Sequence, residues 1–420
     1  MLFRFVARLV PEIQRAGGAM HLEFMRSIDT YVGSACLLVV RVLWRMFDGA
    51  RARNTHPDSI STVMFQKFFG IGSIVNALPT LRRFRRQYPD AHFVFVTFPA
   101  QEEIVRLSGL ADDVRVIDNR NLARLVLSTL ATLRALTRRG VDMSVDLEFF
   151  TRFPMLLACL SGAAVRVGFD SRQDATRRAL LTHPTSFNNH AHIARNYLAM
   201  AEAVGMDCSG EDLDIGLPSV GAGRPETVHR FLGDDRRQPL ATLVAGVSEL
   251  CTLRAWPTTH FAELIRRMES QWPDTVFALI GTAEQRPRID DVIRLAGGDA
   301  PHLLNLAGRT SFLEAVALIE ASSVVISNDG GPAHIAAAHD VPVVVMYGPE
   351  TPVIYRPLSD KAHVFYEPPF CSPCLNALEN KAHVFCPHTQ CMYNITVDAV
   401  FSAVSEVLGT SGPGHGLRVA

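Results

Sequence analysis

The stretch SNDGGPAHIAAAH at residues 327–339 has the residue types of an anion-binding turn between a strand and a helix. Asp329 suits the N-cap position, because its carboxylate can accept the free amide hydrogens of the next helical turn. Gly330 and Gly331 let the backbone approach a ligand closely, and His334, one turn further on, can add a hydrogen-bond donor. Unpaired amides and the positive end of the helix dipole favour phosphate at such a point. The same pattern also fits an ordinary strand-to-helix turn of an α/β protein.

A second group of polar residues follows two other apolar segments. Ser73 ends the glycine-containing loop 67–73, which precedes a helix expected at 74–88. Asp146 and Glu148 stand at the end of another apolar strand. The carboxyl ends of parallel strands share one edge of the sheet, where ligands bind, so we expect these side chains on one edge. For Asp146, a structural role as an end-of-strand cap is the alternative.

Four cysteines near the C-terminus have the spacing Cys-x2-Cys-x11-Cys-x4-Cys, at Cys371, Cys374, Cys386 and Cys391. This spacing suits tetrahedral structural zinc, and unpaired thiols or one disulfide are the alternatives. The other four of the eight cysteines are scattered, which argues against a disulfide framework and favours a reducing compartment. The pentapeptide KAHVF occurs at 361–365 and 381–385 and predicts two edge strands that flank this loop.

The polar segment 182–196 holds three histidines. His190 and His192 have no nearby carboxylate at the i, i+4 spacing of a helical metal site. A surface loop that leads into a helix is therefore favoured over a metal site.

The chain of 420 residues is long enough for two domains of ordinary size and an extension. Hydrophobic residues make up 48% of it, which excludes wholesale disorder. The formal net charge of −1 gives no general affinity for nucleic acid, so any basic patch must be local.

Apolar strands alternate with amphipathic helices along most of the chain, which predicts doubly wound parallel sheets. The alternation covers 59–215, is interrupted by the Gly-rich segment 207–224, and resumes over 225–395. We therefore expect two Rossmann-like domains that face one another across a cleft, and a closing helix with a tail at 396–420. Strands are expected at 60–66, 92–98, 114–117, 141–147, 165–169, 240–245, 275–280, 303–306, 323–327 and 342–347.

Residues 1–58 form a helical extension with a different composition. The apolar run 31–40 is too short for a transmembrane helix, which needs roughly 20 apolar residues, and no convincing cleavage site of a secretory signal follows it. Between 37 and 47, large apolar residues alternate with arginines, as in a helix that lies on a membrane surface. Peripheral contact with a membrane is therefore expected, and a helix that covers the body of the protein is the alternative.

Several separate segments of the chain resemble glycosyltransferase family 9, which contains the ADP-heptose:lipopolysaccharide heptosyltransferases. They are SNDGGPAHIAAA at 327–338, VPV at 341–343, YGPETP at 347–352, ALPTLR at 77–82, DLE at 146–148, RVGF at 166–169 and WP at 256–257. The resemblance implies a GT-B fold in which the second domain mainly holds the nucleotide sugar and the first holds the acceptor. It also implies transfer with inversion at the anomeric carbon and without a metal or other cofactor.

The resemblance assigns donor-binding roles to individual residues. The glycines and histidine of the opening motif, with Asp329, match the family's phosphate-binding segment, whose N–H donors must stabilise a leaving diphosphate. Ser248 and Arg254 match the polar and basic positions before Trp-Pro, although the family often has lysine in place of Arg254; an arginine fork also holds phosphate. Glu284 matches the acid that binds the donor ribose, and a helix N-terminal acid is its alternative.

The expected catalytic base departs from the family pattern. Well-known heptosyltransferases have aspartate directly after the second glycine of the first loop, where this chain has Ser73. Serine has no usable basicity near neutral pH, yet inverting transfer needs a group that takes the proton of the acceptor hydroxyl. Asn76 also replaces a histidine that is frequent in those enzymes. Glu148 and Asp146 are the expected substitutes for the base.

The sequence thus predicts a glycosyltransferase that moves a sugar, heptose from ADP-heptose, onto a lipopolysaccharide-type or other lipid-linked glycan. Its expected location is the cytoplasm or the inner face of the cytoplasmic membrane. The alternative is a GT-B protein that binds a nucleotide or glycan with weak or lost transfer activity, because Ser73 replaces the base. A nicotinamide dehydrogenase is disfavoured, because no strand precedes a full G-x-G-x-x-G with an acid about 20 residues later.

Overall fold

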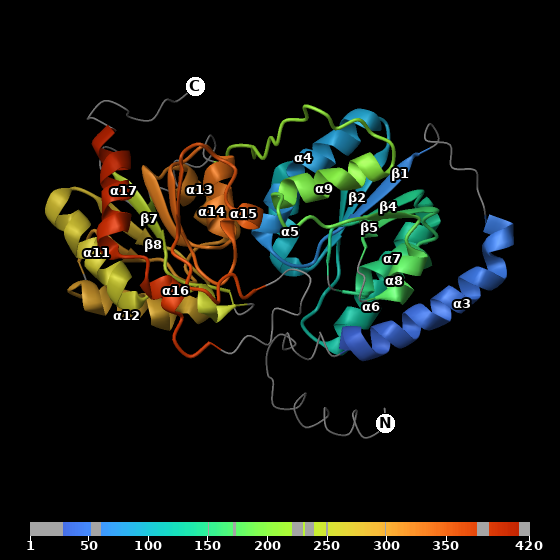
Figure 1. The fold of residues 1–420 in the computed structure, drawn as a ribbon, viewed down its shortest axis with the longest axis horizontal. Coiled ribbons are helices and arrows are strands. Elements are labelled where there is room, and N and C mark those ends of the chain that lie inside the picture. Colours follow the sequence, from blue (N-terminus) through green and yellow to red (C-terminus); the bar gives the residue numbers. More distant parts are fainter. Residues whose placement is uncertain are drawn as a thin grey trace, which may run out of the picture. The chain divides into compact units, whose positions relative to one another are not determined.

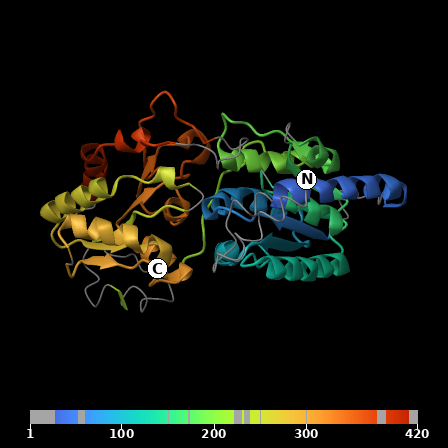
Figure 2. The ribbon, with the colours of Figure 1, turned by 90° about the horizontal axis from the view of Figure 1, so that it is seen from below.

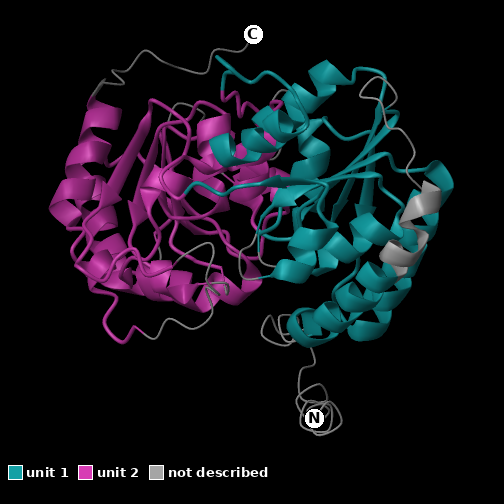
Figure 3. Ribbon diagram, turned by 45° about the vertical axis from the view of Figure 1, so that its right-hand side comes forward, with its two compact units in different colours: residues 1–69, 79–188, 194–212 teal, residues 70–78, 189–193, 213–420 magenta. Residues whose placement is uncertain are grey.

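The computed structural model describes residues 28–51, 60–149, 151–170, 174–220, 230–231, 239–248, 251–298, 300–375 and 386–410. The chain divides into two compact units (Figure 3). Residues 1–69, 79–188 and 194–212 form the first unit, and residues 70–78, 189–193 and 213–420 form the second. Each unit contains one six-stranded parallel sheet.

The first sheet has the strand order β3-β2-β1-β4-β5-β6, with every neighbouring pair parallel. Its central strand β1 is buried along its whole length, in keeping with the apolar residues at the middle of its sequence, TVMFQ. The strands are β1 (Thr62–Gln66), β2 (His92–Thr97), β3 (Asp113–Val116), β4 (Met143–Asp146), β5 (Val165–Phe169) and β6 (His183–Thr185).

Helices cover both faces of this sheet (Figure 1). They are α4 (Ile71–Gln87), α5 (Pro99–Ser108), α6 (Leu122–Arg139), α7 (Phe153–Leu160), α8 (Ala175–Leu180) and α9 (Ile193–Ala203). A π-helical turn η1 (Asp29–Gly33) leads into α3 (Ser34–Arg51), which packs against α7 and α8. Leu37 and Val40 of α3 are buried in the same hydrophobic cluster as residues of α6 and α7, so the N-terminal helix is part of the first unit.

The second sheet has the strand order β12-β11-β10-β7-β8-β9, again parallel throughout. Its strands are β7 (Leu240–Val244), β8 (Val276–Leu279), β9 (Leu303–Asn305), β10 (Val324–Asn328), β11 (Val343–Tyr347) and β12 (Ala362–Tyr366). Its helices are α11 (Thr258–Gln271), α12 (Arg286–Ala296), α13 (Phe312–Glu320), α14 (Gly331–Ala338), α15 (Pro352–Tyr355), α16 (Gln390–Tyr393) and α17 (Val397–Thr410), with the 3-10 turns η4 (Thr252–Arg254) and η5 (Ala283–Gln285).

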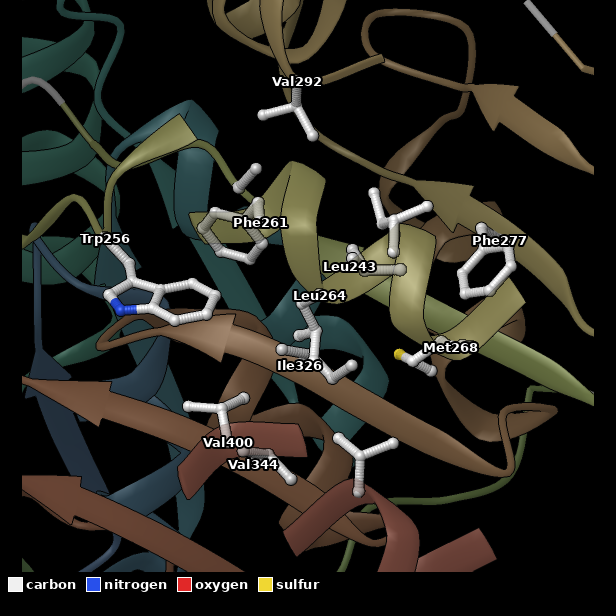
Figure 4. Packing of buried hydrophobic residues seen from close by; sticks show 14 of the residues in the cluster. Leu243, Trp256, Phe261, Leu264, Met268, Phe277, Val292, Ile326, Val344 and Val400 are labelled. Atoms are coloured by element: carbon white, nitrogen blue, oxygen red, sulfur yellow. The ribbon is translucent and has the colours of Figure 1, made fainter. Parts of the chain in front are cut away.

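The core of the second unit packs its sheet against α11 and against α17 near the end of the chain. Trp256, Phe261 and Leu264 pack against Ile326 of β10 and Val400 of α17 in one buried cluster (Figure 4). The indole Nε1 of Trp256 donates to the carbonyl of Ile395, at 2.9 Å, which satisfies the polar atom of this buried ring. The closing helix α17 thus completes the core of the second sheet.

The predicted α/β architecture with two Rossmann-like sheets is confirmed, and each predicted strand appears with small shifts at its ends. The first KAHVF segment forms the edge strand β12, whereas the second lies outside the described residues. The prediction of loop between 67 and 73 is wrong at its end, because α4 begins at Ile71 and includes Ser73 in its first turn. The segment expected as a surface loop from residue 182 contains the short strand β6.

The described helices include none with both the length and the apolar character needed to cross a bilayer.

Candidate functional site

The carboxyl edge of the second sheet brings together the predicted donor-binding residues. The strands β8 and β9 are added on one side of β7, and β10, β11 and β12 on the other, so the winding of the sheet reverses between the neighbours β7 and β10. Ligands of doubly wound sheets bind in the crevice at this point, beyond the carboxyl ends of the two strands. Ser248 follows β7, Glu284 follows β8, and the segment 329–334 follows β10. The topology therefore places them all on one edge of the sheet.

The turn from β10 to α14 has the predicted form, with one correction. Gly330 is the N-cap residue, in an extended conformation (φ −178°, ψ 175°), and no side chain caps the helix. The prediction that Asp329 caps it is wrong, because the Asp329 carboxylate instead pairs with Arg254 (Oδ2 to Nε, 3.3 Å). Among the described residues, the amides of Gly330 and Gly331 have no hydrogen-bond acceptor. The helix thus begins with open donors, the arrangement that binds anions.

Asn328 fixes this turn to the neighbouring strand, a role that the sequence reading did not identify. Its Oδ1 accepts the backbone N–H of Trp256 at 2.8 Å. Its Nδ2 lies within hydrogen-bonding distance of the carbonyls of residues 244, 245 and 246, which end β7. A buried amide at the end of an apolar strand was the available signal, since a buried polar group needs partners.

Arg254 is held between two carboxylates. Besides Asp329, its guanidinium donates to Glu350, at 2.8 Å, and Glu350 is buried directly after β11. Burial disfavours the charge of Arg254, but the two carboxylates outweigh that cost and raise its pKa. Arg254 therefore stays a cation, and its charge is already balanced by protein acids. Sequence reasoning missed Glu350, although it stands in the YGPETP segment.

His334 is buried in the first turns of α14 and is neutral. Burial, with smaller contributions from His192 and Arg254, lowers the pKa of His334 to about 3. Its Nδ1 lies 3.3 Å from Nδ2 of Asn76 in α4, another residue whose role was not predicted. Because an amide nitrogen only donates, Nδ1 is the acceptor and the proton of the neutral ring is on Nε2. The imidazole can therefore act as a neutral N–H donor.

Gly72 allows this close approach of α4 to His334. A Cβ at residue 72 would lie 2.4 Å from Cδ2 of His334, so any side chain there would displace the ring. Ser73 follows directly, and residues 70–78 are grouped with the second compact unit. The glycine loop thus contributes to the surroundings of the histidine.

Ser248 and Glu284 are the exposed members of the set. A hydrogen bond from the Thr282 side chain and one from its own backbone amide lower the pKa of Glu284, so it is a carboxylate near neutral pH. The neighbouring Gln285 fixes the turn η5, because its Nε2 donates to the carbonyl of Val247 at 2.8 Å. An exposed carboxylate on a fixed turn can accept two hydroxyl groups of a ribose.

At the carboxyl edge of the first sheet, Asp146 and Glu148 are buried and already bound. Glu148 accepts from Lys67 Nζ at 2.8 Å on one oxygen, and from the amides of Phe68 and Phe69 at 2.7 and 2.9 Å on the other. Asp146 pairs with Arg177 at 2.7 Å and accepts the amide of Glu148 at 2.9 Å. Glu148 therefore holds the chain after β1 to the chain after β4, where the order of this sheet also reverses, and Asp146 holds the end of β4 to Arg177 of α8.

The partners of these two acids were not predicted. Lys67 and Arg177 are almost completely buried, at 3% and 2% exposure. Burial raises the pKa of Asp146, although Arg177 opposes this shift. Burial alone would lower the pKa of Lys67, but Glu148, with smaller contributions from Tyr197 and Asp146, raises it, so the lysine stays charged. A lysine directly after an apolar strand was the signal that could have indicated a buried ion pair.

Cys371 and Cys386 lie close enough to Cys374 and Cys391 to affect the thiol pKa of both. Burial, with a smaller contribution from the neighbouring thiols, raises the pKa of Cys391 to about 11 and also raises that of Cys374. The described part of the chain contains no group of three or more His, Cys, Asp or Glu side chains arranged to hold a metal ion. Zinc at these cysteines stays a prediction.

His192, in the polar segment 182–196, donates from Nε2 to the carbonyl of Arg356 at 2.8 Å.

The chain is similar to known glycosyltransferases. The model of glycosyltransferase family 9 (heptosyltransferase) matches residues 130–384. Lipooligosaccharide heptosyltransferase 2 of Haemophilus influenzae is 32% identical over 183 residues, which is 41% of this chain and 51% of that protein. Lipopolysaccharide heptosyltransferase 2 of Salmonella typhimurium is 30% identical over 177 residues, 41% of this chain and 50% of the relative. The chain thus spans about half the length of these curated relatives.

Among solved structures, ADP-heptose lipopolysaccharide heptosyltransferase II of Escherichia coli is similar with a TM-score of 0.65 and 19% identity. The similarity covers 84% of this chain and 99% of that one. At this identity the likeness shows the fold, which is GT-B.

Proposed function

Because the chain belongs to glycosyltransferase family 9 (heptosyltransferase), we propose that it transfers heptose from ADP-heptose to a lipopolysaccharide-type or other lipid-linked glycan. One observation carries this proposal most directly. The segment that resembles the family's phosphate-binding segment opens α14 with two free amides, and a neutral imidazole with a defined N–H lies one turn further on.

The donor would lie along the carboxyl edge of the second sheet. The diphosphate would be bound by the amides of Gly330 and Gly331 and by Nε2–H of His334, and the ribose by Glu284, with Ser248 as a further polar contact. Arg254 is largely neutralised by Asp329 and Glu350, so we assign it a positioning role for the β10–α14 turn as well as a phosphate contact. Neutral donors that are fixed before the reaction stabilise developing charge without reorganisation.

In the proposed reaction, a hydroxyl oxygen of the acceptor attacks the anomeric carbon of the donor sugar. The bond from that carbon to the diphosphate oxygen breaks on the opposite face, ADP leaves, and the configuration inverts. The hydroxyl proton passes to a base, and the open amides of α14 meet the charge of the departing ADP. We propose that this chemistry proceeds without a metal ion, since amide and imidazole donors stabilise the leaving group.

Glu148 is the proposed base, with Lys67 as the partner that it must leave. In the present arrangement both oxygens of Glu148 accept hydrogen bonds, so the ion pair has to open when the acceptor binds. Asp146 is bound on both oxygens as well, and we assign it to holding the frame through Arg177. Ser73 stands at the family position of the base but lacks basicity.

A second candidate function is supported by the same contacts. If the Lys67–Glu148 pair does not open, the first unit offers no free carboxylate at the sheet edge from Asp146 or Glu148. The protein would then bind a nucleotide sugar or glycan with weak or lost transfer.

The test is ADP release from ADP-heptose in the presence of a heptose-deficient lipopolysaccharide acceptor, with UDP-hexoses as competing donors. We expect turnover with ADP-heptose, loss of donor affinity in His334→Ala, and no turnover with UDP-hexoses. Binding of ADP-heptose without turnover would support the second function. Binding of neither nucleotide sugar would contradict both.

The proposed acceptor is lipid-linked, so the proposed place of action is the inner face of the cytoplasmic membrane, with the protein as a peripheral component.

A further inference from the structure

The outer surface of α3 and α6 carries most of the exposed apolar side chains of the described residues. Nine of the thirteen large hydrophobic residues that are exposed lie on η1, α3 and α6. They are Tyr31, Val32, Leu38, Val39, Val42, Leu122, Val126, Leu127 and Leu130. Single exposed apolar residues need no explanation, but a concentration of this kind marks an interaction surface.

The two helices lie on the same side of the first sheet. Both pack against α7, and residues of both enter one hydrophobic cluster. Figure 1 shows α3 and α6 on the same side as α7, and Figure 2 shows the same unit from below. We define their solvent-exposed faces as the α3–α6 face.

The position of α3 is fixed by the body of the first unit. Asp29 accepts the amides of Arg152 and Phe153, each at 2.9 Å, and so caps the start of α7. Leu37 and Val40 are buried, while Leu38, Val39 and Val42 on the opposite side are more than half exposed. The helix thus covers the body with one face and presents a second apolar face to its surroundings.

The charges on α6 indicate what binds this face. Its sequence, LARLVLSTLATLRALTRR, contains four arginines and no acidic residue. Leu127, Leu130, Arg134 and Arg138 are exposed and lie within about 80° of one another around the helix, so apolar and cationic side chains share its outer face. Among the described residues, no carboxylate pairs with Arg134, Arg138 or Arg139.

We propose that the α3–α6 face docks on an anionic lipid bilayer, with its apolar side chains in the interface and the arginines of α6 on lipid phosphates. Amphipathic helices with arginine and leucine bind membranes in this way. A second copy of the chain fits less well, because a self-complementary interface needs acidic partners for these arginines and α6 has no acidic residue. The proposal rests on the proposed function in one respect, because a lipid-linked acceptor gives the protein a reason to bind a membrane.

The test is co-sedimentation of the full chain with vesicles, without donor or acceptor, so that its outcome is independent of transfer activity. Vesicles of phosphatidylglycerol mixed with phosphatidylcholine are compared with vesicles of phosphatidylcholine alone. We expect binding to the mixed vesicles, and a loss of about tenfold or more in Leu127→Ser/Leu130→Ser and in Arg138→Gln/Arg139→Gln. The matched controls Val353→Ser and Arg266→Gln/Arg294→Gln change exposed residues of the second unit and should bind like the wild type.

Absence of wild-type binding to anionic vesicles would overturn the proposal, as would equal binding by the α6 variants and their controls. A dimer in sedimentation velocity that Leu127→Ser/Leu130→Ser dissociates, without vesicle binding by the wild type, would assign the face to a second copy instead. Two variant pairs are used because the arginine pair leaves the apolar packing intact if the leucine pair fails to fold.

Discussion

The carboxyl edges of the two sheets use the same topology in different ways. At the first edge, Asp146 and Glu148 are buried and paired with Arg177 and Lys67, so the polar groups hold the strands together. At the second edge, Glu284 and Ser248 are exposed and the amides of the β10–α14 turn are open. The difference shows that a carboxylate at the end of a strand indicates a binding site only when its hydrogen-bond and ion-pair partners are known. The polar groups of the first edge are satisfied within the protein, whereas the second edge has the open amides that we propose as the donor site.

The largest expected effect is on stability, from a substitution in the buried ion pair at the edge of the first sheet. Lys67→Met removes one partner of a buried ion pair and leaves Glu148 uncompensated, so we expect a loss of about 3–5 kcal/mol in the free energy of unfolding. Urea unfolding measures this change. Arg106→Gln removes a partner of an exposed i, i+4 pair and should cost less than about 0.5 kcal/mol. A loss in Lys67→Met no larger than in this control would show that the buried pair does not support the fold.

Glu148→Gln tests whether the first edge also does chemistry. If Glu148 leaves Lys67 and acts as the base, turnover per folded molecule should fall about hundredfold or more while donor affinity stays constant. Steady-state kinetics and calorimetric ADP titration separate the two quantities. Unchanged turnover per folded molecule would remove Glu148 as the base and leave it a purely structural carboxylate.

Low pH should reduce the free energy of unfolding through protonation of His334. Its pKa is lowered to about 3 in the folded chain, against 6.5 when unfolded, so the unfolded state binds more protons between these values. Stability therefore falls as pH decreases below 6.5, by about 2 kcal/mol at pH 5 from this group alone. His334→Gln should remove this part of the fall in unfolding experiments at pH 5 and 7. An identical pH dependence in wild type and variant would show that the ring is not buried in neutral form.

Asn76→Ala has the smallest expected effect and tests whether the Asn76 contact positions His334 for binding ADP. Without the Asn76 amide, the proton of His334 is no longer held on Nε2, and we expect ADP affinity to fall about tenfold. Thr80→Ala, at a buried position one turn further along α4, is the matched control and should bind ADP like the wild type. Equal ADP affinity in Asn76→Ala and the control would show that the Asn76 contact does not position the imidazole.

Local sequence rules predicted the elements well where the determinants are close in the chain. The strand β5 has the predicted bounds, Val165–Phe169, and a local capping box of Ser311 and Glu314 starts α13. The same kind of rule failed at Asp329, because an ion pair with the distant Arg254 took the carboxylate away from the helix. Such competition between a local cap and a remote partner is invisible in one sequence.

The site shows the same division. The β10–α14 segment was predictable because strand, glycines and helix are contiguous. Lys67, Arg177 and Asn76 were not, because their roles depend on partners far away in the chain, such as Glu148, Asp146 and His334. Burial decides whether a charged residue binds a ligand or another side chain, and burial of single polar residues is set by the packed fold.

The most direct test of the proposed donor site is calorimetric titration of ADP into the wild type, Gly330→Ala and Gly409→Ala. A Cβ at Gly330 meets no atom closer than 3.8 Å and its backbone is extended, so this variant should fold normally, as should Gly409→Ala, whose Cβ meets nothing within 4 Å. If the diphosphate lies against the open amides of α14, the added methyl group obstructs it, and ADP affinity should fall about tenfold or more in Gly330→Ala only. Equal affinity in all three proteins would contradict the assignment of the phosphate site.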